Sequence, residues 1–148
     1  MKSKEDLYPF SKCLLFSSGA LARSMNRIAE DCFAPLGMSP SQAFVLMNVI
    51  QRPGIAIGEL ASMLMLAPST VTRLVESLDK QGLTKKVTEG RSSIVFAKEE
   101  AFLLKEQFES CYTAMYKRYV SILGEKQSKQ LAELNFKASL KMNADGLD

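Results

Sequence analysis

The segment "ELASMLMLAPSTVTRLVESLDKQGL", residues 59–83, decides the fold. Its apolar side chains recur every three to four residues in two runs, with only a short stretch around Leu66 and Ala67 between them. Four apolar side chains of the second run fall on one helix face: Val71, Leu74, Val75 and Leu78. Gly82 follows this run, where a left-handed residue commonly ends a helix. The pattern therefore predicts two helices that are joined by a tight turn.

The second of these helices is predicted to begin with small hydroxylated side chains. Pro68 suits the first position of this helix. The N–H that proline lacks would have no partner within the helix there, and the φ of proline is already that of a helix. Ala67 is a weak N-cap. Since backbone N–H groups at a helix start attract phosphate and arginine can pair with guanine, this helix suits a DNA major groove. A helical hairpin that only packs is the alternative. The candidate contacts on this helix are Pro68, Ser69, Thr70, Thr72 and Arg73.

A basic β-hairpin is predicted directly after the helix pair. "LTKKVT" and "SSIVFA" are rich in β-branched residues and are joined through Glu89, Gly90 and Arg91. Lys85 and Lys86 precede this turn. Residues 73–98 hold six basic and three acidic side chains, so they carry a charge of +3, which equals the net charge of the whole chain. Such a patch suits a polyanion, although a solvated charged face is the alternative.

The remaining pattern predicts a mainly α-helical fold with a small β-wing. Ser39, Pro40 and Gln42 match the N-cap, first position and capping box of another helix, which ends before Pro53. The other predicted elements are a helix over 8–34, an edge strand over 55–57, a helix over 98–123, a break at Gly124, a helix over 127–142 and an unstructured tail over 143–148. We therefore expect one domain of 148 residues.

The composition argues against an enzyme. The chain has no His, which removes the most frequent general base and metal ligand, and it shows neither a glycine-rich phosphate loop nor a clustered carboxylate pair. We therefore expect no catalytic residues, no metal site and no cofactor. The three cysteines form no CxxC motif, and an odd count is typical of reduced cytosolic thiols. Glu5 and Asp6 interrupt any signal-peptide pattern, and no apolar run reaches about 18 residues, so a cytoplasmic protein is expected.

The segment "IGELASMLMLAPSTVTRLVESLDKQGLTKK", followed by "GRSSIVFA", resembles the MarR family of bacterial winged helix-turn-helix regulators. The resemblance rests on "LA" in the first helix, "STVTRLV", the L-x-x-x-G-L pattern and the wing arginine. It implies a DNA-binding lobe over 40–97 and dimerisation helices over 1–38 and 99–143. It further implies a homodimer that binds pseudo-palindromic double-stranded DNA, and we expect a repressor that a small, often aromatic, molecule releases.

The resemblance also assigns residues. Ser69, Thr70, Thr72 and Arg73 would enter the major groove, and Arg91 would enter the minor groove. The wing is short, however, and Glu89-Gly90 stands where the family usually has an aspartate that orients this arginine. The dimer would be made by helices that carry Leu7, Phe10, Leu14, Tyr112, Tyr116, Tyr119, Leu131 and Leu134.

Effector binding leaves several alternatives. An apolar effector pocket is predicted to be lined by Met25, Phe33, Met38, Phe44 and Met47, for which plain core packing is the alternative. Redox sensing through Cys13 is another hypothesis, because some family members sense oxidants through a cysteine near this position. A winged-helix adaptor that binds only proteins would need an apolar face on residues 69–80, where the sequence is polar.

Overall fold

The computed structural model describes residue 1 and residues 3–144. The chain divides into two compact units, which we call the winged lobe and the terminal-helix unit. The winged lobe is Ala29–Tyr112, and the terminal-helix unit combines Met1–Ile28 with Thr113–Asp148. Two long helices, α1 (Leu14–Phe33) and α6 (Lys105–Leu123), each continue from one unit into the other. The chain therefore connects the units twice, both times through a helix.

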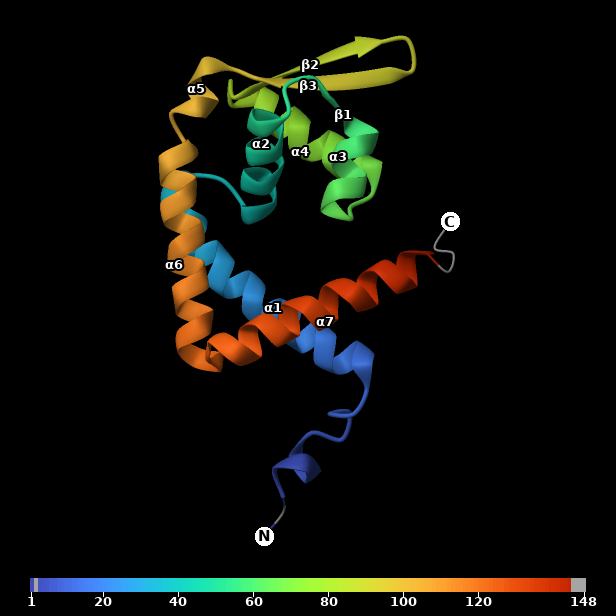
Figure 1. Ribbon diagram of the computed structural model, residues 1–148, viewed down its shortest axis with the longest axis vertical. Coiled ribbons are helices and arrows are strands. Elements are labelled where there is room, and N and C mark those ends of the chain that lie inside the picture. Colours follow the sequence, from blue (N-terminus) through green and yellow to red (C-terminus); the bar gives the residue numbers. More distant parts are fainter. Residues whose placement is uncertain (2, 145–148) are drawn as a thin grey trace. The chain divides into compact units, whose positions relative to one another are not determined.

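The winged lobe packs three helices against a small antiparallel sheet (Figure 1). The strand order is β1-β3-β2, so the short strand after residue 54 lies at one edge, as expected. Nine large apolar side chains are almost completely buried in its core: Phe33, Val45, Leu46, Val49, Leu60, Val71, Val75, Leu78 and Val95. The elements in chain order are η2 (Ala34–Leu36), α2 (Pro40–Gln51), β1 (Ile55–Ala56), α3 (Ile57–Leu64), α4 (Pro68–Lys80), β2 (Thr84–Glu89), β3 (Ser92–Ala97) and α5 (Glu99–Phe102).

A left-handed residue makes the tight turn between α3 and α4 possible. Met65 has φ of 54° and is the non-glycine residue with positive φ in the described chain. Its N–H bonds to the carbonyl of Ser62 at 3.2 Å, and the N–H of Leu66 bonds to that of Ala61 at 3.0 Å. This is the Schellman pattern that ends a helix abruptly. Two residues later Pro68 starts α4, so the turn needs only Met65, Leu66 and Ala67.

The predicted helix signals at α2 and at the end of α4 are confirmed. The Ser39 hydroxyl accepts from the Gln42 N–H at 3.2 Å, and the Gln42 side chain accepts from the Ser39 N–H at 2.9 Å, which forms the expected capping box. Gly82 has φ of 76° and ends α4. Its N–H bonds to the carbonyl of Asp79, and the N–H of Leu83 bonds to that of Leu78, both at 3.0 Å. These ends place α4 directly before the hairpin.

The hairpin turn consists of Gly90 and Arg91, because Glu89 pairs with Ser92. Gly90 has φ of 60°, which suits the first central position of a type II′ turn, where glycine is preferred. The two strands are therefore in register from Thr84 opposite Ala97 to the turn. The expected wing is thus present.

The terminal-helix unit contains η1 (Lys4–Leu7), most of α1, the end of α6 and α7 (Glu125–Ala144). Gly124, with φ of 82°, separates α6 from α7, as the sequence predicted. Hollows lie within this unit. One of about 610 Å³ lies between α1 and α7, and another, of about 230 Å³, also reaches α6.

Three predicted boundaries are wrong. The first helix begins at Leu14 rather than at residue 8, because Pro9 disfavours helical geometry in the residue before it. The helix expected over 98–123 is divided between Phe102 and Lys105, where no Gly or Pro marks a break, and the fully buried Ala101 holds α5 against α2. The last helix runs over 125–144, so residues 143 and 144 are helical, and residues 145–148 of the predicted tail lie outside the described residues.

Candidate nucleic-acid interface

The start of α4 presents a polar, cationic surface. Ser69 and Arg73 are exposed, whereas Thr70 and Thr72 are half-buried. The N-cap position is Ala67, which offers no side-chain acceptor to the backbone N–H groups of the first turn. Within the part of the chain that the structure describes, Arg73 forms no ion pair. This helix end can therefore accept an anion and present a guanidinium one turn further on.

The hydroxyl of Thr72 is already used inside the helix. Its Oγ1 donates to the carbonyl oxygen of Pro68 at 3.0 Å. Thr72 therefore keeps only an acceptor function for an external partner, such as the exocyclic amine of a base. Of the three predicted hydroxyls on α4, that of Ser69 is the most exposed.

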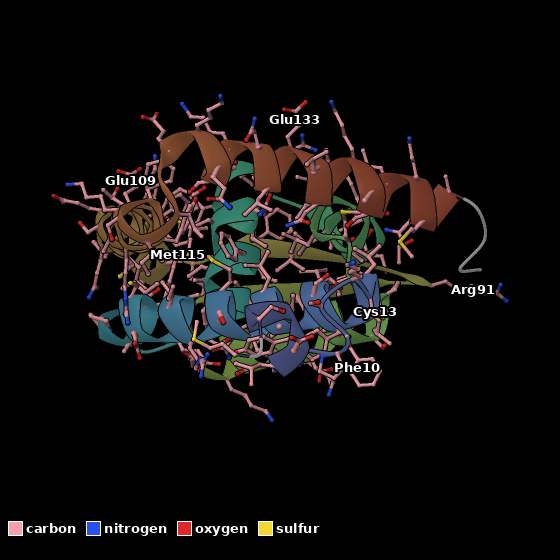
Figure 2. The ribbon with its side chains drawn as sticks, turned by 90° about the horizontal axis from the view of Figure 1, so that it is seen from below. Phe10, Cys13, Arg91, Glu109, Met115 and Glu133 are labelled. Atoms are coloured by element: carbon pink, nitrogen blue, oxygen red, sulfur yellow. The ribbon has the colours of Figure 1, made fainter. Side chains whose placement is uncertain are left out.

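The wing carries two exposed basic residues. Arg91 lies in the turn between β2 and β3, and its side chain extends away from the end of the hairpin (Figure 2). Lys85 is exposed on β2. Among the described residues neither side chain has an ion-pair partner. Both are thus available to an external polyanion such as a phosphate backbone.

Lys86 lies differently from the other predicted contacts. Its Nζ lies 3.3 Å from Oε1 of Glu76 on α4, and its side chain is 25% exposed. Its backbone N–H donates to Oδ2 of Asp79 at 3.2 Å. Lys86 therefore joins the wing to α4, and its charge is partly compensated before any ligand binds.

A second contact at this joint escaped the sequence analysis. The hydroxyl of Thr84, which is 1% exposed, donates to Oδ1 of Asp79 in a short hydrogen bond. Asp79 thus accepts from two groups of β2, and it lies one turn along α4 from Glu76. In the sequence, Glu76 and Asp79 contributed only to the net charge of residues 73–98. The signal for Asp79 in the sequence was its place three residues before Gly82, the glycine that ends the helix.

The five predicted effector residues lie in both units. Phe33 and Phe44 belong to an aromatic cluster in the winged lobe, where the ring centroid of Phe33 lies 5.6 Å from that of Phe108 and 6.0 Å from that of Phe44. Tyr112, which is half exposed, completes this cluster at 6.1 Å from Phe108. Two methionines of the same lobe, Met38 and Met47, are buried, and Met25 lines the hollows of about 610 and 230 Å³ in the terminal-helix unit.

The three cysteines differ in exposure. Cys13 is exposed, and it lines a hollow of about 410 Å³ together with Phe10, Phe16 and Arg23. Cys32 is half-buried and Cys111 is buried. Burial, and second the nearby Cys32 thiol, raise the pKa of the Cys111 thiol above its ordinary value. Cys111 is therefore mostly protonated near neutral pH.

The terminal-helix unit exposes many large apolar side chains. Leu15 is 83% exposed and Leu134 is 64% exposed. The others along these helices are Leu14, Ile122, Phe136, Leu140 and Met142. Exposed apolar surface of this extent is typical of an interface with another protein. The predicted dimer residues Leu7 and Phe10 are also exposed, whereas Tyr116, Tyr119 and Leu131 are half-buried.

Neither a cluster of metal ligands nor a membrane-spanning helix occurs among the residues that the structure describes. Over residues 1 and 3–144, no group of three or more His, Cys, Asp or Glu side chains could hold a metal ion. None of the helices in that part of the chain combines the length and the apolar character that a membrane span requires.

Comparison with solved structures shows the same fold in regulators that differ strongly in sequence. CouR bound to a 23-mer DNA duplex has a TM-score of 0.79 and 18% identity, over 94% of this chain and 99% of that one. CouR from Rhodococcus jostii RHA1 bound to p-coumaroyl-CoA has a TM-score of 0.74 and 19% identity, over 88% and 94% of the two chains. The S. aureus MepR–DNA complex has a TM-score of 0.71 and 19% identity, over 87% and 97%.

No curated protein sequence matches the chain. The MarR family profile, in contrast, matches residues 36–91, which run from the end of η2 to the wing turn and contain α2, α3 and α4. Solved members with this fold are described as transcriptional regulators rather than as enzymes. The resemblance found in the sequence is thereby confirmed over residues 36–91, and the chain has the winged helix-turn-helix fold of the MarR-family regulators that it is similar to.

Proposed function

We propose that this protein is a homodimeric, sequence-specific DNA-binding regulator that acts as a transcriptional repressor and is released by a small molecule. The observation that carries the proposal is the winged lobe, which presents Ser69 and Arg73 at the start of α4 and Lys85 and Arg91 on the wing, all of them exposed. Two proteins with this fold, MepR and CouR, have been solved with DNA. In this role the protein would act in the cytoplasm.

On DNA, α4 would lie in the major groove with its amino-terminal end toward the bases. Arg73 would read base edges, and Ser69, Thr70 and Thr72 would contact phosphates or bases at short range. Arg91 would enter the adjacent minor groove, while Lys85 would bind the phosphate backbone. Pro68 and Lys86 would hold these groups in place, Pro68 by starting the helix and Lys86 through its ion pair with Glu76.

A homodimer is supported by the exposed apolar side chains of the terminal-helix unit. Two copies would bind two half-sites whose centres lie about 34–36 Å apart on one face of the duplex, since this is one helical turn of DNA. A pseudo-palindromic operator follows from the two-fold symmetry of such a dimer.

Release by a small aromatic molecule is supported by the aromatic cluster around Phe33 and Phe44, in which Tyr112 is half exposed. Rings of this kind pack well against an aromatic ligand. CouR, which shares the fold, has been solved with p-coumaroyl-CoA, an aromatic thioester.

The test is selection of bound sequences from random DNA duplexes, followed by affinity measurements on the selected and on random duplexes at several salt concentrations. We expect a selected inverted repeat and a logarithm of affinity that falls linearly with the logarithm of salt concentration. A mass measurement by light scattering should give twice the mass of one chain. Equal affinity for all duplexes, or a monomer at micromolar concentration, would contradict the proposal.

Redox sensing through Cys13 stays as a second candidate function, because this cysteine is exposed beside the guanidinium-bearing Arg23 in a hollow. If Cys13 is the sensor, peroxide should lower the DNA affinity of the wild-type protein and leave that of Cys13→Ser unchanged. The same response in both proteins would remove Cys13 from the mechanism.

A further inference from the structure

Gln42, in the first turn of α2, forms hydrogen bonds with both ends of its side-chain amide. Its Oε1 accepts from the Ser39 N–H at 2.9 Å, as part of the capping box. Its Nε2 donates to Oγ of Ser77 at 2.7 Å, although Ser77 lies 35 residues further along the chain, within α4. Gln42 therefore joins the start of one helix to the helix that carries the candidate DNA contacts.

The orientation of the Gln42 amide follows from its two partners. The backbone N–H of Ser39 can only donate, so it must face the amide oxygen. The amide nitrogen then faces the Ser77 hydroxyl, whose oxygen can accept. Gln42 and Ser77 are both half-buried, and both ends of the amide are occupied. Because α2 packs directly against α4 (Figure 1), a side chain fixed in this way can hold the second helix in place.

Ser77 lies at one edge of the apolar stripe of α4. With 3.6 residues per turn, successive residues turn by about 100°, so Ser77 and Asp79 are about 200° apart around the helix axis. The arc between them contains the buried side chains of this helix, Val71, Val75 and Leu78. On the other edge, Asp79 accepts hydrogen bonds from β2. The helix is thus held by hydrogen bonds at both edges of its buried stripe.

The edge that carries Ser77 is the one next to Arg73. Arg73 precedes Ser77 by four residues, so the two lie on the same side of α4, one turn apart. Apolar packing is non-directional, and it leaves the helix some freedom to rotate about its axis. A hydrogen bond requires its donor and acceptor to be aligned. The bond from Gln42 therefore restricts this rotation on the side of α4 that presents Arg73.

We propose that Gln42 is a positioning residue that contributes to the sequence specificity of DNA binding. Through Ser77 it fixes the rotation of α4 about its axis, and with it the direction in which the Arg73 guanidinium meets the base edges. The inference rests on the proposed function, since it needs α4 to lie in the major groove. Phosphate contacts carry no sequence information directly, whereas bidentate base contacts depend on geometry. Loss of the bond should therefore affect binding to the preferred duplex and not to random DNA.

The experiment compares full-length variants by fluorescence anisotropy, on the selected duplex and on random DNA. Ser77→Ala removes the acceptor for Gln42 and leaves the capping box intact. We expect the ratio of the two affinities to fall about 2- to 10-fold, which corresponds to the net contribution of one hydrogen bond. The affinity for random DNA and its dependence on salt concentration should not change. Ser77→Thr keeps the hydroxyl and should keep the wild-type ratio.

Ser39→Ala is the matched control for stability. It removes the hydroxyl that accepts from the Gln42 N–H, but the Ser39 backbone still donates to Oε1, so the bond to Ser77 is kept. The variant should unfold at a lower temperature than the wild type, because the N-cap is lost, and should retain the wild-type affinity ratio. If Ser39→Ala and Ser77→Ala lower the ratio equally, the ratio follows stability and the proposal is wrong.

The same loss should appear when the donor is removed. Gln42→Met keeps the length of the side chain without its polar atoms, and it should lower the affinity ratio as much as Ser77→Ala does. The double variant should have the same ratio as either single variant, because all three lack the same hydrogen bond. Additive losses in the double variant would show that the two residues act separately, which contradicts the proposal.

A measurement without DNA examines the bond itself. In NMR spectra of nitrogen-labelled protein, the side-chain amide signals of Gln42 should move in Ser77→Ala. Those of Gln107, which donates to the Pro35 carbonyl instead, should stay in place. Unchanged Gln42 signals, or a wild-type affinity ratio in Ser77→Ala, would overturn this inference while the proposed function stands. A wild-type protein that prefers no duplex would overturn both.

Discussion

At the scale of single residues, the start of α4 lacks a side-chain acceptor for its first backbone N–H groups. Ala67 occupies the N-cap and has no side chain that could accept from the first backbone N–H groups. The Thr72 hydroxyl does not compensate, since it bonds to the Pro68 carbonyl. A bound phosphate would supply the missing acceptor, because helix N-termini bind anions. This helix start is therefore slightly less stable than one with a side-chain N-cap, and its free N–H groups can bind an anionic ligand.

This leads to a prediction for Ala67→Ser. A serine hydroxyl at the N-cap should stabilise the free protein by about 0.5–2 kcal/mol, which is the usual difference between serine and alanine at this position. The measurement is urea unfolding of the variant and of the wild type in the absence of DNA. Ser62→Ala, at an exposed position of α3, serves as the comparison. A variant no more stable than the wild type would show that the N–H groups in the first turn of α4 already have acceptors.

Arg73 and Lys85 should differ in what they contribute to binding. Arg73→Ala should reduce discrimination between the selected operator and random DNA by about 1–3 kcal/mol, because a bidentate pair with guanine is lost. Lys85→Ala should weaken binding to all duplexes about equally. It should also reduce the slope of the logarithm of affinity against the logarithm of salt concentration by about one, since one phosphate contact is lost. Fluorescence anisotropy on both duplexes at three salt concentrations measures both effects.

The matched control for these two variants is Arg52→Ala. Arg52 is also an exposed arginine of the winged lobe, but its guanidinium lies 2.9 Å from Glu59 and is not part of the predicted interface. We expect little change in either affinity for this variant. If Arg73→Ala weakens binding to operator and random DNA by the same factor, Arg73 does not read bases.

At the scale of elements, the joint between α4 and the wing rests on Asp79. Its carboxylate accepts from the buried Thr84 hydroxyl and from the Lys86 N–H, so it fixes where β2 leaves the helix. The ion pair between Lys86 and Glu76 is more exposed, with 51% of the Glu76 side chain open to solvent. Exposed pairs contribute about 0–1 kcal/mol, whereas a buried hydroxyl left without a partner costs about 1–3 kcal/mol.

We therefore expect Asp79→Ala to destabilise the protein by about 1–3 kcal/mol and Glu76→Ala by at most about 1 kcal/mol. Adding Thr84→Val to Asp79→Ala should restore part of the loss, because valine has the shape of threonine without the hydroxyl that needs a partner. Urea unfolding of the single and double variants forms a double-mutant cycle. Strictly additive losses would show that the two side chains do not interact in solution.

The helix bounds also show where local sequence signals are enough to predict an element. The bounds of α2 and the ends of α4 follow from local signals, namely a capping box, a proline at the first position and a glycine at the end, and all of them were predictable. The break between α5 and α6 has no such signal. It depends on Ala101 being buried against α2, which is a contact between elements far apart in the sequence.

At the scale of the whole molecule, the exposed apolar side chains of the terminal-helix unit lead to a prediction about assembly. Leu15→Glu together with Leu134→Glu should convert the proposed dimer into a monomer, since a charge buried in an apolar interface is strongly unfavourable. DNA affinity should then fall by at least about tenfold, because one half-site contact is lost. Sedimentation velocity and anisotropy measure the two effects.

Glu133→Gln is the control for this variant. Glu133 lies next to Leu134 on α7, and its carboxylate pairs with Lys137 at 2.5 Å on the surface of the same helix. Removing one exposed charge there should change neither the assembly nor the DNA affinity. Should the double glutamate variant remain a dimer, the interface lies on other residues.

Local chemistry was enough to predict the helix-turn-helix, the wing and the resemblance to the MarR family, because each depends on residues close together in the chain. The apolar stripe of α4, its Pro68 start and its Gly82 end act through their own helix, and so do the exposed Ser69 and Arg73. The turn residue Met65 is different, since no sequence signal marks methionine as a left-handed residue.

The contacts between distant segments needed the three-dimensional arrangement. The contacts of the Asp79 carboxylate at the base of the wing and the compensation of Lys86 by Glu76 both arise from packing between elements. Side-chain periodicity shows which face of a helix turns inward, but it does not show which other face it meets. That choice follows from how the buried side chains of all elements fill one core together, and a single segment contains no information about it.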